Sequence, residues 1–202
     1  MAVKPKRRPG RPSTGARERV VAAARELFLE HEYDEVSTEQ ILARSGVSRG
    51  ALYHHFPTKL ELFRAVYEAS ERGVLERVAA KAIAATDPFE ALLAAASAYL
   101  KLAESDEELR RIGLTQSRAV LGWSGWRQAA TDLGIGVVRA MVSAAIDAGQ
   151  LKPHDPDTTA QVLLGALIEA AMLIVVADDP AKARQQSEAV IGDLLSGLRT
   201  TG

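Results

Sequence analysis

Apolar residues recur along this chain at intervals of three and four positions, which is the spacing of one face of a helix. Val20, Ala24, Leu27, Phe28 and His31 form one such face near the N-terminus. Neither the alternation typical of strands nor a repeat of roughly 20–50 residues occurs. The pattern therefore predicts an all-α protein of about nine helices.

Two short helices are predicted in quick succession after residue 36. Ser37 and Gln40 have the spacing of a capping box, and this helix should end near Ser45–Gly46, because glycine readily adopts the left-handed conformation that closes a helix. Ser48 caps the next helix, so only a turn remains between the two. This arrangement predicts a helix-turn-helix, although a generic corner in a helical bundle fits the spacing equally well.

A long helix is predicted next. Thr58 and Glu61 form another capping box, and apolar residues then continue without a break before Asp87. Some 25 residues would span roughly 40 Å, so this helix is expected to connect two domains. Three later helix starts place an aspartate cap before a proline: Asp87–Pro88, Asp155–Pro156 and Asp179–Pro180.

Charge is distributed unevenly, although the net charge is only −1. Residues 1–60 carry 11 Lys and Arg against 7 Asp and Glu, and the rest of the chain is acidic. Residues 1–12 hold five of the basic residues and three prolines, so we expect a disordered basic arm. A basic N-terminal third favours a polyanionic partner.

Several classes of protein are disfavoured. The chain has no cysteine, which excludes disulfides and cysteine-based metal centres. The longest apolar run, residues 162–177, is interrupted by Glu169, so we interpret it as a buried helix and expect no membrane association. No signal peptide, catalytic signature or metal-ligand spacing is recognisable, and we expect a cytoplasmic protein without enzymatic activity, cofactor or metal.

The second short helix carries chemistry suited to DNA. A helix in the major groove presents its N-terminal residues to base edges, where Arg49 can contact guanine through two hydrogen bonds. Gly50 would let the backbone approach closely, at a cost in helix stability of about 0.8–1 kcal/mol relative to alanine. Phosphate contacts are expected from Tyr53, His54, His55 and Lys59, although Tyr53 and His55 could also belong to the core, to which we assign Leu52 and Phe56.

The segment over residues 17–64 resembles the tetracycline-repressor (TetR) family. The resemblance is carried by ILARSGVS at 41–48, GALYHHF at 50–56 and KLELF at 59–63. It implies that the groove-facing residues are Ser48, Arg49, Gly50 and Ala51, and that the phosphate clamp is formed by Ser37, Thr38, Tyr53, His54, His55 and Lys59. The sequence departs from the family pattern at Glu32, where glycine is usual and the turn could therefore be strained, and at His54, where tyrosine is frequent.

The resemblance also implies the organisation of the rest of the chain. We expect a helix-turn-helix domain over residues 13–60 and a helical ligand-binding and dimerisation domain over 61–202. The basic arm would insert Arg8 and Arg11 into a minor groove, unless it is only a solvated tail that adds non-specific affinity.

A homodimer is implied, in which two C-terminal helices pack against their copies in a four-helix interface. The alternative is that these helices are buried wholly within one subunit. The expected interface residues are Leu164, Leu167, Ile168, Ala171, Val175, Ile191, Leu194, Leu195 and Leu198.

The family likewise implies a cavity for a small, hydrophobic effector of unknown identity. Its expected lining residues are Tyr67, Tyr99, Gln116, Trp123, Trp126, Met141, Glu169 and Met172. The implied function is a ligand-responsive regulator, most simply a repressor, that binds a near-palindromic operator of double-stranded DNA as a dimer. The rival hypotheses are a DNA-binding protein without sequence preference, an activator, and an enzyme built on the C-terminal helices.

Overall fold

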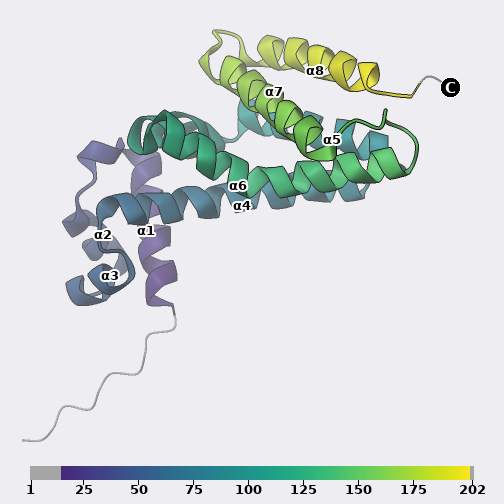
Figure 1. The fold of residues 1–202 in the computed structure, drawn as a ribbon. Coiled ribbons are helices and arrows are strands. Elements are labelled where there is room, and N and C mark those ends of the chain that lie inside the picture. Colours follow the sequence, from purple (N-terminus) through teal and green to yellow (C-terminus); the bar gives the residue numbers. More distant parts are fainter. Residues whose placement is uncertain (1–14, 201–202) are drawn as a thin grey trace, which may run out of the picture. The chain divides into compact units, whose positions relative to one another are not determined.

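The computed structural model describes residues 15–200, which fall into two compact units that divide between Phe63 and Arg64 (Figure 1). The described residues form eight α-helices, one 3-10 turn and one π-helical segment, with no strand. The all-α prediction is therefore confirmed, with eight α-helices instead of about nine. The arm that carries Arg8 and Arg11 lies outside the described residues.

The first unit contains the short helices. It comprises α1 (Ala16–Glu30), a 3-10 turn (Tyr33–Glu35), α2 (Thr38–Ser45), α3 (Arg49–His55) and the start of α4 (Lys59–Ile83). Its core is a cluster of fully buried apolar side chains, in which the rings of Phe28 and Phe63 meet edge to face with centroids 5.0 Å apart. Such a pair adds to the stability that burial of the rings provides.

The helix boundaries of this unit follow from the capping chemistry. Ser37 Oγ accepts a hydrogen bond from the backbone N–H of Gln40 at 3.2 Å, and Ser37 N–H donates to Gln40 Oε1 at 2.6 Å. Gly46 ends α2 with a φ of 63°, in the left-handed region. Ser48 Oγ accepts from the N–H of Ala51 at 3.3 Å and starts α3. The capping predictions are confirmed here, because they depend only on neighbouring residues.

Two expectations for this unit are wrong. Glu32 has a φ of −72°, and no described residue other than glycine has a positive φ, so the turn that replaces the usual glycine is not strained. His31 is the C-terminal cap of α1, and its side chain is 47% exposed, so it does not continue the buried face. The chain becomes extended at this residue, which turns the imidazole away from the helix face.

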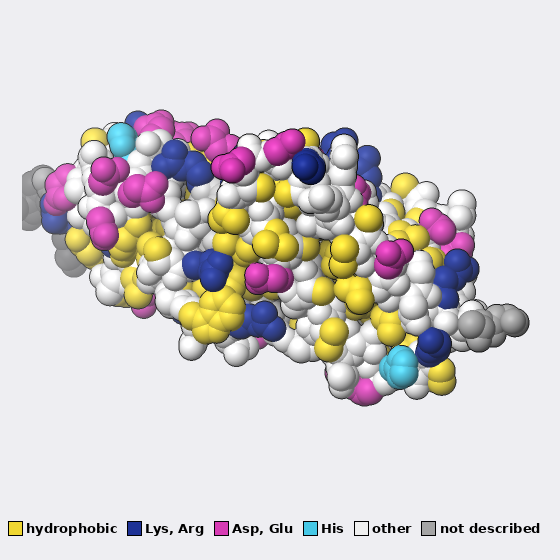
Figure 2. All heavy atoms as spheres, turned by 90° about the horizontal axis from the view of Figure 1, so that it is seen from above, with side chains coloured by type: hydrophobic (Ala, Val, Ile, Leu, Met, Phe, Trp, Pro, Cys, Tyr) yellow, Lys and Arg dark blue, Asp and Glu magenta, His cyan; other side chains and the backbone are white. Residues whose placement is uncertain are grey.

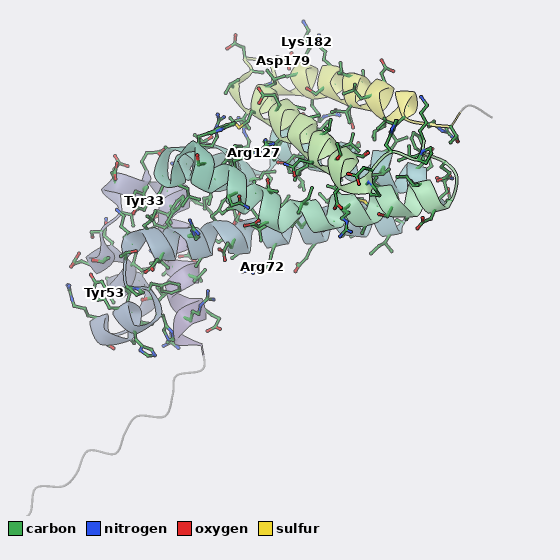
Figure 3. All side chains as sticks on the ribbon, in the orientation of Figure 1. Tyr33, Tyr53, Arg72, Arg127, Asp179 and Lys182 are labelled. Carbon is green, nitrogen blue, oxygen red and sulfur yellow. The ribbon has the colours of Figure 1, made fainter. Side chains whose placement is uncertain are left out.

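The second unit is a bundle in which α7 is central (Figure 1). It contains the remainder of α4, then α5 (Pro88–Ser105), the π-helical segment η2 (Leu109–Gln116), α6 (Ser117–Asp147), α7 (Pro156–Val176) and α8 (Pro180–Gly197). Helix α7 packs against α5, α6 and α8. Aspartate caps precede proline at the starts of α5, α7 and α8, as predicted. At α8, Asp179 Oδ1 accepts a hydrogen bond from the backbone N–H of Lys182 at 3.0 Å, and Figure 3 shows the two residues side by side.

Charged side chains fix α8 against α5. Arg184 of α8 pairs with Glu104 of α5 and with Glu188 one turn along its own helix. Glu188 in turn accepts a hydrogen bond from the Ser97 hydroxyl of α5. A partly buried network of this kind holds the two helices in one register, because each group has its partner in place.

Two stretches are long and apolar enough to span a membrane by length and composition alone. They are Leu109–Asp147 and Pro156–Val176, with mean hydropathies of 1.4 and 2.1. The central helix of a bundle passes the same test, because it is apolar on more than one face. The expectation of no membrane association stays a prediction.

Candidate functional site

The leading end of α3 lies on the surface of the first unit. Ser48, Arg49 and Gly50 are exposed, whereas Leu52 and Phe56 are 2% and 3% exposed and anchor the opposite face of the helix in the core. The helix is thus fixed by its apolar side while its first turn faces outward. This is the arrangement that a helix needs to enter a groove of DNA.

Arg49 has a partner within the protein. Its Nη2 lies 2.6 Å from Glu39 Oε1 of α2, and the two side chains are 60% and 62% exposed. The pairing holds the pKa of the Glu39 carboxyl below its usual range, chiefly through the hydrogen bond from Arg49. An ion pair this exposed contributes little to stability, so Arg49 can exchange the carboxylate for a guanine edge at small cost.

Gly50 is not required by its surroundings in the protein. A β-carbon at this position would meet no atom within 4 Å, and its φ is not in the left-handed region. Glycine therefore lowers the stability of α3 without relieving any contact. Close approach of another molecule to the backbone would explain why glycine occupies this position.

Three further candidate contacts lie on the same helix. Tyr53 is 40% exposed and is seen on α3 in Figure 3. His54 and His55 are also exposed, with their ring centroids 5.2 Å apart. The alternative that Tyr53 and His55 belong to the core is therefore not supported by the structure.

The hydroxyl groups at the start of α2 take part in local hydrogen bonds. Ser37 Oγ caps the helix, and Thr38 Oγ1 donates to Glu39 Oε2 at 3.1 Å. The hydroxyl proton of Ser37 is not used in this cap, because the oxygen acts there as an acceptor. Their contacts with DNA stay predictions.

The amino group of Lys59 forms hydrogen bonds within the first unit. Its Nζ donates to the carbonyl oxygens of Tyr33 at 2.6 Å and Val36 at 2.8 Å, and it lies 4.1 Å from the centroid of the Tyr33 ring. Burial lowers the pKa of Lys59 from its ordinary value. The residue ties the start of α4 to the turn before α2, a role that sequence reasoning missed, and only its third proton remains for a phosphate.

The second unit contains a cavity of about 60 Å³ between its helices. Helix α4 contributes Glu71, Leu75 and Val78, and α5 contributes Ala95 and Tyr99. The remaining lining comes from α6 and α7: Ala130, Gly134, Val137, Val138, Met141, Leu164, Leu167 and Ile168. The walls are thus almost wholly apolar, which suits a small hydrophobic ligand.

One corner of this cavity is polar. Glu71 is half-buried, and burial, with a smaller contribution from the negative charge of Glu108, raises the pKa of its carboxyl to about 7. Burial and the neighbouring Glu71 carboxylate raise the pKa of the Tyr67 and Tyr99 phenols. Sequence reasoning missed Glu71, because a single acid on a long helix gives no sign of which helices surround it.

The candidate effector residues are not all brought together. Tyr99 and Met141 line the cavity, Tyr67 is fully buried near Glu71, and Gln116 is buried in η2. Trp126 is also buried, with its Nε1–H donating to the carbonyl of Gly113 at 3.1 Å. The other three lie elsewhere: Trp123 and Met172 border a surface hollow, and Glu169 borders a groove between α7 and α8.

The expected interface residues lie in different environments within the single chain, and their role in a dimer stays a prediction. Leu164, Leu167 and Ile168 line the cavity, while Ala171, Ile191 and Leu195 are buried within the single chain. Of the remaining three, Leu194 is 50% exposed, whereas Val175 and Leu198 are half-buried. The reason is that α7 is apolar on several faces, so periodicity could not distinguish the inner face from the outer one.

The outer face of α7 and α8 carries an apolar set that shares only Leu194 with the expected interface. Its exposed members are Val162, Leu173, Val176, Val190 and Leu194. Figure 2 shows hydrophobic side chains gathered across this side of the larger unit, with charged residues around them. Exposed apolar surfaces of this kind are typical of interaction sites.

Comparison with known proteins agrees with these features. Residues 20–66 match the family of bacterial regulatory proteins called tetR, and residues 89–198 match a tetracyclin repressor-like C-terminal domain. The chain is 29% identical to the transposon Tn10 TetC protein of Escherichia coli over 76% of its own length and 77% of that protein. It is 33% identical to the transcriptional activator FasR of Mycolicibacterium smegmatis over 50% of its own length and 46% of that protein.

A solved structure extends the likeness to the whole fold. The crystal structure of a TetR-family transcriptional regulator from Pectobacterium atrosepticum superposes with a TM-score of 0.82 and 31% identity, covering 95% of this chain and 99% of that one. The two matched family domains, the exposed helix-turn-helix and the shared architecture thus all point to the same family. The chain belongs to the TetR family of ligand-responsive, DNA-binding transcriptional regulators.

Proposed function

We propose that this protein is a repressor that binds a near-palindromic operator as a homodimer and is released by a small molecule bound in the cavity of its second unit. The observation that carries the proposal is the exposed first turn of α3, held in place by the buried Leu52 and Phe56. Action in the cytoplasm, without catalysis or a membrane partner, belongs to the same proposal.

Base recognition rests on Arg49 and the backbone around it. The guanidinium presents two parallel donors that match the O6 and N7 acceptors of guanine. Glu39 holds the side chain in an exposed position at the front of α3 before DNA binds. Ser48, Gly50 and Ala51 supply a narrow helix edge, which allows the first turn to sit deep in the major groove.

Phosphate contacts would surround this edge. Tyr53, His54 and His55 supply hydroxyl and imidazole donors from α3, and Ser37 and Thr38 lie at the start of α2. Neutral donors and helix N-termini are common phosphate partners, and they set the register of the helix without reading sequence.

Dimerisation would place two such helices on one duplex. The apolar face of α7 and α8 is the surface available for it, because its exposed leucine and valine side chains lie on neighbouring helices. Two copies related by a two-fold axis would bury the same face on each subunit. A palindromic operator mirrors that symmetry.

Release by a ligand would use α4, which is continuous between the units. It begins at Lys59, whose amino group donates a hydrogen bond to the carbonyl of Tyr33 in the first unit. Its later residues Glu71, Leu75 and Val78 line the cavity. A ligand that binds one conformation of the second unit more tightly shifts the population toward that conformation.

Selection of duplexes from a random pool by the full-length protein tests this function. The proposal predicts an enriched sequence with two inverted half-sites whose centres lie about 10 base pairs, or a multiple of this spacing, apart. Strong retention of all sequences without enrichment would instead favour a DNA-binding protein without sequence preference.

A further inference from the structure

The charge of the cavity lining is the feature that identifies its ligand most closely. Glu71 is the only charged residue among the residues that line the cavity, and Tyr99 is the only other polar side chain there. No lysine, arginine or histidine belongs to the lining. The cavity therefore combines apolar walls with one ionisable carboxyl.

We infer that the cavity takes a compact apolar amine, whose ammonium group pairs with the Glu71 carboxylate. This inference rests on the proposed function, because it names the chemical class of the effector. It requires only groups that the described residues already place at the cavity.

An anionic ligand does not suit this environment. A carboxylate or phosphate would be buried next to Glu71 with no cation in the lining to pair with it, and Glu108 adds negative charge nearby. A buried charge without a partner costs free energy that apolar contacts must first offset. An ammonium group, in contrast, receives a partner that is already there.

A neutral ligand would use only part of the site. An alcohol could donate a hydrogen bond to Glu71, but it brings no charge to pair with the ionised carboxylate. An ammonium forms a charge-assisted hydrogen bond in which both partners are ionised, so it also gains the attraction between opposite charges. Tyr99 also lines the cavity and is its only aromatic residue, a side-chain type whose ring face attracts cations.

The size of the cavity limits the ligand. A volume of about 60 Å³ is enough for a few water-sized groups, since one such group occupies about 10–15 Å³ on the same measure. The preferred amine is accordingly a short or cyclic aliphatic one, and a larger molecule must push the helices apart. Small ligands of this kind bind at best with micromolar dissociation constants.

The surroundings of Glu71 predict how pH affects binding. The titratable groups that interact electrostatically with Glu71 are Glu108 and the phenols of Tyr67 and Tyr99. The lining residues from α6 and α7 have no titratable side chain. The pKa of Glu71 is raised to about 7, and only its ionised form pairs with an ammonium. Amine affinity should therefore rise as the pH rises, by about tenfold between pH 6 and pH 8.

Three probes of similar shape and different charge test the inference: cyclopentylamine, cyclopentanol and cyclopentanecarboxylate. Each is titrated into the full-length protein at pH 8 and followed by NMR chemical shifts. We expect the amine to bind at least tenfold more tightly than the alcohol, and the carboxylate to bind weakest. The variant Glu71→Gln should bring the amine to the level of the alcohol.

Glu76→Gln is the matched control, because Glu76 lies on the same helix and is exposed away from the lining. It removes the same charge and should leave the preference for the amine intact. Equal binding of amine and alcohol, tighter binding of the carboxylate, amine affinity that falls with pH, or no binding of any probe would each overturn the inference.

A parallel DNA-binding assay distinguishes failure of this inference from failure of the proposed function. The same protein preparations are assayed without probe against the duplex enriched from the random pool. Specific DNA binding together with failure of the amine would refute only the ligand class. Loss of specific DNA binding in the wild-type protein would refute the proposed function itself.

Discussion

At the scale of a single residue, Gly50 is expected to lower the stability of α3 and to favour DNA binding. A β-carbon there meets no protein atom within 4 Å, so the variant Gly50→Ala should raise the free energy of unfolding by up to about 1 kcal/mol. The same methyl group would separate α3 from a base edge, and operator affinity should fall by roughly tenfold or more. Thermal unfolding and DNA titration of one preparation measure both effects.

Gly136→Ala provides the control for this prediction. Gly136 is exposed within α6 and likewise has open space around it. Its substitution should give a similar gain in stability without a change in DNA binding. If Gly50→Ala bound the operator as tightly as the wild type, close approach at this residue would be refuted.

Residue-level prediction from sequence succeeded where partners are neighbours in the chain. The Ser37 cap and the Gly46 helix end depend on residues three or four positions away. The partners of Lys59 lie 26 and 23 positions away, and the Glu108 and Tyr99 side chains that interact with Glu71 lie on other elements, so no local pattern could reveal them. Arg49 was predicted to contact DNA, and its pairing with Glu39 was not predicted.

The π-helical segment is the element whose geometry is least predictable from sequence. A β-carbon on Gly113 would lie 2.6 Å from Glu71 Oε1 and 2.8 Å from Leu109 Cδ1. Gly113→Ala should therefore destabilise the protein by roughly 1–2 kcal/mol, because these two side chains must move. Chemical denaturation measures the change, and Gly136→Ala, which should stabilise, is the control. Equal stability of both variants would show that η2 accommodates the methyl group.

Helix starts were predicted well, and interruptions within helices were not. The three Asp-Pro starts follow from one local rule. The break in α6, where Gly122 has a φ of 69° and a ψ of 164°, and the π-helical segment before it depend on packing of the whole bundle. Tertiary contacts set such features, and the hydrophobic period does not reveal them.

At the scale of the whole molecule, the outer face of α7 and α8 is predicted to hold the dimer together. Leu173 is 56% exposed in the single chain, so Leu173→Lys should leave the subunit folded. It would place a charge in the centre of an apolar interface, and sedimentation should then report monomers with operator affinity reduced by at least tenfold.

Ile83→Lys is the matched control, because Ile83 is 83% exposed at the end of α4 and lies off this face. It should leave the protein dimeric. A dimer that persists in Leu173→Lys would show that another surface joins the subunits. Sequence alone could predict that α7 and α8 have surplus apolar residues, but only the packed bundle shows which of them remain outside.

Repeating the site selection with Arg49→Ala tests most directly whether the first turn of α3 reads DNA. The account predicts the same half-site spacing, a loss of preference at one base pair in each half-site, and a cost of roughly 1–3 kcal/mol for the operator alone. An unchanged selected sequence, or an equal loss of affinity for operator and random duplexes, would contradict it.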